Sequence, residues 1–83
     1  MEKEKYTTMD AVREVLTAWK PGTEMLGYEI AEAVRQRTYA RNGSRPLDAT
    51  VLRYVRTYKG VFGITVPKYG ESLYRKDLTE GRG

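Results

Sequence analysis

The sequence lacks cysteine and histidine and has no long apolar segment. Without cysteine, neither disulfides nor thiolate metal sites can stabilise the fold; without histidine, the usual general base and zinc ligand are missing. The apolar runs are a few residues long, far short of the roughly 20 residues of a membrane span. The charged start MEKEKYTT has no apolar region of the kind found in secretory signals. These absences predict a soluble cytoplasmic protein that carries no cofactor and no metal.

The 83 residues suffice for one small domain with a thin core. We expect this domain to comprise residues 7–76, between a flexible leader (1–6) and a flexible tail (77–83). Charge is unevenly distributed: residues 1–34 hold seven acids and four bases, whereas residues 35–76 hold ten bases and two acids. Such asymmetry suggests a polyanionic partner, but a solvated face that maintains solubility explains the charge equally well.

Hydrophobic periodicity predicts three amphipathic helices. The first begins at Thr7 or Thr8, either of which can cap it. The second covers residues 27–38, and the third covers residues 46–58, with Gly60 able to end it. The side chains expected to form the core of the three helices are Val12, Leu16, Ile30, Val34, Val51 and Val55.

The residues after the third helix predict a β-hairpin. Residues 61–66 are β-branched and alternating, residues 72–76 form a returning strand, and a loop with proline and glycine joins them. Arg75 and Lys76 on the returning strand would follow a phosphate backbone or protect an exposed strand edge. The segment Thr23–Leu26 is either an extended linker or a short third strand.

This order of elements, with the segments GYEIAEAV, ATVLRYVRTYKG and SLYRK, resembles the winged helix-turn-helix domain. That domain is an α+β fold with three helices and a C-terminal hairpin called the wing. LGYEIAEAV and LYRKDLTEGRG are also similar to the second helix and the end of the wing in PadR-like transcriptional regulators. Two departures are a longer connection between the second and third helices, and the absence of the dimerisation helix that follows the wing in PadR-like proteins.

The resemblance implies that the third helix enters the major groove of DNA, while the wing contacts the backbone or the minor groove. Helical spacing places a polar face opposite the buried valines of the third helix. Arginine can pair with guanine or phosphate, threonine can contact a phosphate or a thymine methyl, and alanine permits close approach. The alternative is an exposed helical face with no partner. The candidate residues on this helix are Ala49, Thr50, Arg53, Arg56 and Thr57.

Four further candidates lie outside the third helix. Arg45 precedes that helix and could contact a phosphate or simply keep a loop soluble. Lys68 and Tyr69 lie at the expected tip of the wing, where Tyr69 contacts the partner or folds back on the hairpin. Tyr28 begins the second helix, where its hydroxyl and the free N–H groups could bind a phosphate, or its ring could pack on the first helix.

The sequence therefore predicts sequence-specific binding of double-stranded DNA by a small, nucleoid-associated transcription regulator, acting as a homodimer or with a partner protein. Two alternatives remain open. One is a winged-helix module for protein–protein contact in a larger complex, and the other is an RNA or single-strand binder that stacks bases on Tyr69. Glu29 and Glu32 could form an acid–base pair, but without supporting catalytic motifs we expect an exposed acidic face and no enzyme.

Overall fold

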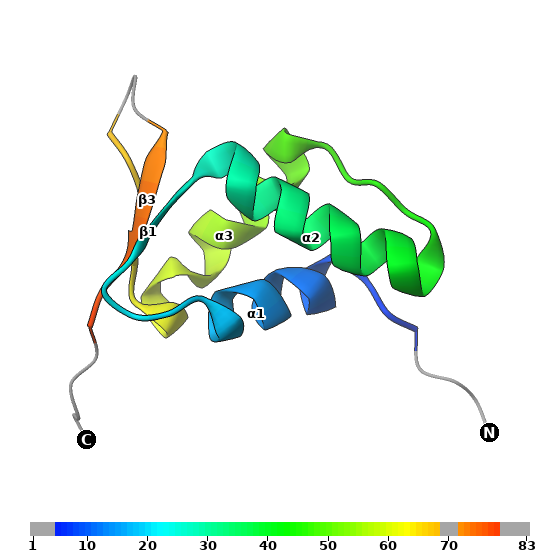
Figure 1. The fold of residues 1–83 in the computed structure, drawn as a ribbon, viewed down its shortest axis with the longest axis horizontal. Helices are drawn as coiled ribbons and strands as arrows, with labels where there is room; N and C mark the ends of the chain where they lie inside the picture. Colours follow the sequence, from blue (N-terminus) through cyan, green and yellow to red (C-terminus); the bar gives the residue numbers. More distant parts are fainter. Residues whose placement is uncertain (1–4, 69–71, 79–83) are drawn as a thin grey trace.

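The computed structural model describes residues 5–68 and 72–78 (Figure 1). This part of the chain is an α+β fold of three α-helices and a three-stranded antiparallel sheet, as the sequence predicted. None of these helices is long and apolar enough to cross a membrane. The elements are, in order, α1 (Thr8–Ala18), β1 (Glu24–Leu26), α2 (Gly27–Asn42), α3 (Asp48–Phe62), β2 (Ile64–Thr65) and β3 (Leu73–Lys76).

The start of α1 follows the predicted capping chemistry. Thr7 is the N-cap: its hydroxyl accepts from the backbone N–H of Asp10 at 3.2 Å, and its own N–H donates to Asp10 Oδ2 at 3.0 Å. This capping box satisfies two N–H groups that have no partner inside the helix. The two hydrogen bonds with Thr7 lower the pKa of Asp10, and the positive charges of Arg13 and Arg41 lower it further.

Both α2 and α3 continue further than their sequence patterns indicate. The loop expected from residue 39 starts only after Asn42, and Gly43, with φ 76°, ends α2. Pro46 lies before α3 and not in its first turn. The connection between the two helices, residues 43–47, is thus shorter than predicted.

The boundary between α3 and the sheet was also wrongly placed. Val61 and Phe62, predicted to begin a strand, form the last turn of α3, and Gly63, with φ 69°, ends the helix in place of Gly60. Phe62 packs edge-on against Tyr58 one turn earlier, with ring centroids 6.2 Å apart. This contact holds the last turn helical, because aromatic side chains four residues apart meet on one helix face.

The sheet has the order β1–β3–β2, so that β3 is the central strand. Glu24 is paired with Arg75 on one side of β3, and Ile64 is paired with Lys76 on the other. The predicted antiparallel pairing of the two hairpin strands is confirmed, and of the two alternatives for Thr23–Leu26 the structure shows the short third strand. Because β3 is central, the interpretation of Arg75 and Lys76 as protection of an exposed edge is wrong.

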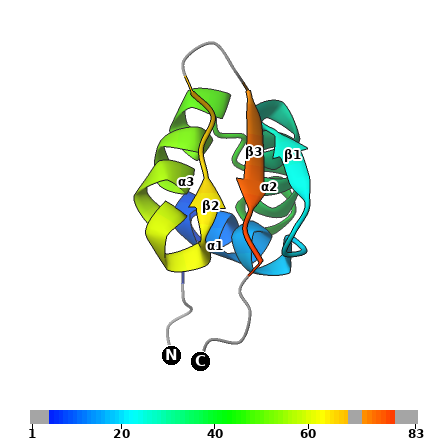
Figure 2. The same cartoon turned by 90° about the vertical axis from the view of Figure 1, so that its left-hand side faces the viewer.

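The core lies where the three helices meet, and the sheet covers one end of them (Figure 2). All six side chains predicted for this core are fully buried. The other buried apolar residues are Ala11, Val15, Trp19, Ala31, Ile64 and Tyr74. The large side chains of Trp19 and Tyr74 fill the space between the helices and the sheet.

Lys76 is buried, with only 7% of its surface exposed. Its ammonium donates to the carbonyl oxygens of Leu16 at 2.5 Å and Trp19 at 2.9 Å, at the C-terminal end of α1. That end has no basic residue of its own in its last turn. Lys76 therefore supplies from β3 the positive charge that a helix C-terminus favours, although burial lowers the pKa of its ammonium.

Tyr6, which we assigned to the leader, packs against the fold. Its hydroxyl donates to Glu14 Oε1 at 2.8 Å, its carbonyl accepts from Asn42 Nδ2 at 2.7 Å, and its ring lies 4.1 Å from the guanidinium of Arg41. Burial and the hydrogen bond to Glu14 raise the pKa of Tyr6 to about 12. The segment before α1 thus joins α1 to the end of α2.

Candidate nucleic-acid interface

The exposed face of α3 follows from its apolar spacing. Val51 and Val55, four residues apart, are fully buried and fix the rotation of the helix against the core. Side chains about half a turn away must then face solvent. Thr50 is half-buried, at the edge of this face. The four other predicted contact residues of α3 are all exposed: Ala49, Arg53, Arg56 and Thr57.

The arginines of this face carry uncompensated charge. Among the described residues, the side chains of Arg53, Arg56 and the neighbouring Lys59 form no hydrogen bond or ion pair. Several other arginines are paired with carboxylates and contribute little net field. These pairs are Arg13–Asp10, Arg35–Glu32, Arg35–Asp48, Arg37–Glu14 and Arg75–Glu24.

Arg35 fixes the start of α3 relative to α2. It donates to Asp48 Oδ1 at 2.6 Å, to the carbonyl of Pro46 at 3.2 Å and to Glu32 Oε1 at 3.1 Å. The hydrogen bonds to Asp48 and Glu32 raise the pKa of the guanidinium. The carboxylate at the start of α3 is thereby neutralised. The local sequence pattern around Arg35 does not indicate this role.

The first turns of α2 and α3 lie on the same side of the molecule as the strand ends that lead to the hairpin connection (Figures 1 and 2). A hydrogen bond of 2.9 Å from Gly27 N–H to the carbonyl of Ser72 joins α2 to β3 there. A Cβ at Gly27 would lie 3.2 Å from Leu52 Cδ1, which explains why glycine occupies this contact. Tyr28, the next residue, is 61% exposed on this side.

The two candidates of the hairpin connection are only partly described. Lys68 is exposed at the end of the segment that leads from β2. Tyr69 lies outside the described residues. The expected contact by this pair stays a prediction.

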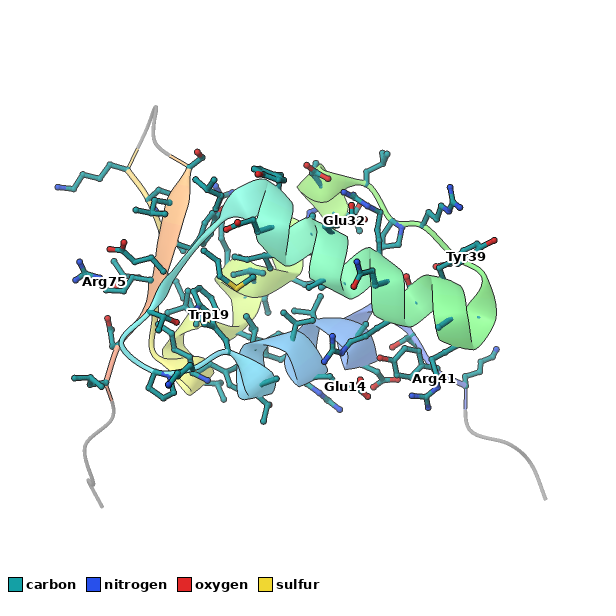
Figure 3. The ribbon with its side chains drawn as sticks, in the orientation of Figure 1. Glu14, Trp19, Glu32, Tyr39, Arg41 and Arg75 are labelled. Atoms are coloured by element: carbon teal, nitrogen blue, oxygen red, sulfur yellow. The ribbon has the colours of Figure 1, made fainter. Side chains whose placement is uncertain are left out.

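Arg45 lies in the connection between α2 and α3, and its guanidinium lies 4.5 Å from the centre of the Tyr39 ring. Tyr39 is 55% exposed near the end of α2 that is farthest from the sheet (Figure 3). Sequence reasoning missed Tyr39 because it assigned this residue to a loop. Tyr39 has a fixed position because α2 continues to Asn42, and recognising Tyr39 as a candidate would have required predicting this continuation.

Two other features of the surface bear on binding. A groove of about 620 Å³ lies between α1 and the end of α2, but it mixes acidic Asp10 and Glu14 with basic Arg37 and Arg41. No group of three or more His, Cys, Asp or Glu within residues 5–68 and 72–78 could hold a metal ion. The exposed cations of α3 are therefore the surface with the clearest chemical preference, which is for an anion.

Comparisons of the chain with protein-family models, with curated proteins and with solved structures found no match. The functional proposal consequently depends on the residues and geometry of this chain.

Proposed function

We propose that this chain is a winged helix-turn-helix domain that binds double-stranded DNA in a sequence-specific manner, as a small transcription regulator. The observation that carries this proposal is the exposed face of α3. Arg53 and Arg56 project from it without a partner among the described residues, while Val51 and Val55 anchor its opposite side.

The order and pairing of the elements support the same proposal. Three helices are followed by the antiparallel pair β2 and β3, and β1 adds a third strand to it. The connection at residues 43–47 is also closer to a helix-turn-helix than the sequence alone indicated.

The dimensions and chemistry of α3 suit the major groove. That groove is about 12 Å wide and admits one α-helix, whose diameter with side chains is about 10–12 Å. Ala49 permits a close approach, and an arginine at position 53 can pair bidentately with a guanine. Thr57 donates its hydroxyl to the carbonyl of Arg53 at 3.1 Å, which leaves its methyl group for apolar contact.

A protein partner is the second candidate, favoured by exposed apolar side chains. Tyr28 is 61% exposed and Leu73 is 45% exposed. The two residues come directly after Gly27 and Ser72, which the hydrogen bond between α2 and β3 joins. A protein-binding module would still bind DNA weakly through its cations, but without preference for a sequence.

Selection of bound sequences from a random duplex pool, at near-physiological salt, tests the proposal. We expect an enriched motif, and a two-fold symmetric motif would show that a dimer binds. The selected duplex should also bind more tightly than either of its single strands. Recovery of no motif would contradict sequence-specific binding and favour the protein-binding module, and preference for the single strand would favour the third alternative.

A further inference from the structure

We infer that Tyr39 is a positioning residue that holds Arg45 ready for a phosphate of the bound DNA. This inference rests on the proposed function and adds a contact on the side of α3 that faces away from the sheet. The cation–π contact of 4.5 Å between Arg45 and the Tyr39 ring lies well within the roughly 6 Å over which such contacts attract.

The contact leaves the hydrogen-bonding capacity of Arg45 available. A cation–π contact uses the positive charge of the guanidinium and occupies no hydrogen-bond acceptor, whereas the guanidinium carries five N–H donors. Among the described residues, Arg45 has no hydrogen bond or ion pair that uses these donors. The carboxylate that lines the small hollow shared by Tyr39 and Arg45 is Glu32, and it is paired with Arg35 at 3.1 Å.

The backbone on both sides of Arg45 is anchored. The carbonyl of Ser44 accepts from the buried hydroxyl of Thr38 at 2.8 Å, and the carbonyl of Pro46 accepts from Arg35 at 3.2 Å. The N–H of Ser44 donates to Asn42 Oδ1 at 2.9 Å. The backbone of Arg45 is therefore fixed in position. The Tyr39 ring can then hold the Arg45 side chain in one direction.

The backbone of Tyr39, whose ring supports Arg45, is equally fixed. Tyr39 lies in the last turn of α2, and its carbonyl accepts the N–H of Gly43, which ends the helix, at 3.0 Å. An arginine held in this way loses less side-chain freedom when it meets a phosphate than an unrestrained arginine does. Figure 1 shows the connection between α2 and α3 at the end of the helices away from the sheet. Arg45 and the hairpin would therefore contact the DNA backbone on opposite sides of α3.

The experiment compares wild type with Arg45→Ala, Tyr39→Ala, Tyr39→Phe and the Tyr39/Arg45 double alanine variant. Duplex binding is measured by fluorescence anisotropy over a series of salt concentrations, and circular dichroism confirms folding. Arg45→Ala should weaken binding and reduce the salt slope by about one unit, because one phosphate contact is lost. Tyr39→Ala should weaken binding by about two- to fivefold, the value of an exposed cation–π contact.

Two of these variants separate positioning from direct contact. Tyr39→Phe keeps the ring and should bind as wild type does, and the double variant should bind no more weakly than Arg45→Ala alone. Losses that add in the double variant would show that Tyr39 contacts DNA independently of Arg45 and would overturn the inference. A loss of duplex affinity with Arg45→Ala but none with Tyr39→Ala would also overturn the inference. The proposed function, binding of duplex DNA, would not be affected by this outcome. A wild-type protein that binds no duplex would overturn the proposed function together with the inference.

Discussion

Lys76→Met removes the buried ammonium that joins β3 to the end of α1. Methionine retains most of the aliphatic stem and therefore the packing, but it cannot make either of the two hydrogen bonds. The carbonyls of Leu16 and Trp19, which accept from the ammonium at 2.5 and 2.9 Å, are left without that partner.

The magnitude depends on two opposing effects. Each hydrogen bond to a charged group contributes about 1.5–3 kcal/mol, so the two bonds together contribute about 3–6 kcal/mol. Burial of the ammonium costs free energy, as its lowered pKa indicates, and the variant is relieved of this cost. The two carbonyls stay buried without a partner in the variant, and this lowers its stability again. We expect a net destabilisation of about 2–4 kcal/mol, or about 8–30 °C in Tm for a domain of this size.

Thermal and urea unfolding, followed by circular dichroism, measure this change. Arg75→Met is the matched control, because Arg75 lies on the same strand but is exposed and points away from the helices (Figure 3). Its ion pair with Glu24, at 3.4 Å, is on the surface and should contribute at most about 1 kcal/mol. Equal stability of Lys76→Met and wild type would show that the two hydrogen bonds do not outweigh the desolvation of the ammonium.

Gly60→Ala should raise the free energy of unfolding by about 0.5–1 kcal/mol, because Gly60 lies inside α3 with open space for a Cβ. Gly63→Ala should lower it, since φ is 69° there, and opposite shifts in Tm check this pair. Tyr6 has its pKa raised from 10.0 to about 12, so the stability that it adds over Tyr6→Phe is complete below about pH 10 and decreases as the pH rises toward 12. Urea unfolding of both proteins across this range tests the sign, and a difference that grows with pH would contradict it. Val51→Ala should lower the free energy of unfolding by about 0.5–3 kcal/mol and should reduce duplex binding only through loss of folded protein, as urea unfolding and anisotropy would show.

The helical core could be predicted from the sequence because it depends on local periodicity. All six predicted core side chains are fully buried, and the exposed face of α3 follows directly from them. The end of α3 could not be predicted in the same way. Gly60 and Gly63 are both able to end a helix, and the choice depends on the packing of Phe62 against Tyr58.

Long-range polar contacts were the other part that sequence reasoning missed. The ammonium of Lys76 donates to carbonyls that lie 57 and 60 residues earlier in the chain, and the half-buried Arg35 donates to Asp48 and to the carbonyl of Pro46. Such partners have no signature in local spacing, and the charge of both residues favoured an exposed position. The platform that Tyr39 offers to Arg45 likewise depends on the turn at Gly43.

The most direct test of duplex binding by α3 is a charge-matched comparison of double variants. Arg53 and Arg56 are replaced by alanine in one protein, and Arg13 and Lys20, exposed on α1 and in the turn after it, are replaced in the other. Both variants lose two positive charges, so a general electrostatic effect would weaken them alike.

The measurement is the affinity for the selected duplex and for a random duplex over a range of salt concentrations. Loss of Arg53 should weaken binding to the selected duplex by about 1–3 kcal/mol more than binding to the random duplex, if this arginine reads a guanine. Loss of Arg56 should weaken all duplexes alike and reduce the salt slope by about one unit. We expect a large loss of affinity for the α3 variant and a small loss for the α1 variant. Equal affinity of the folded α3 variant and wild type would show that this face of α3 does not bind DNA.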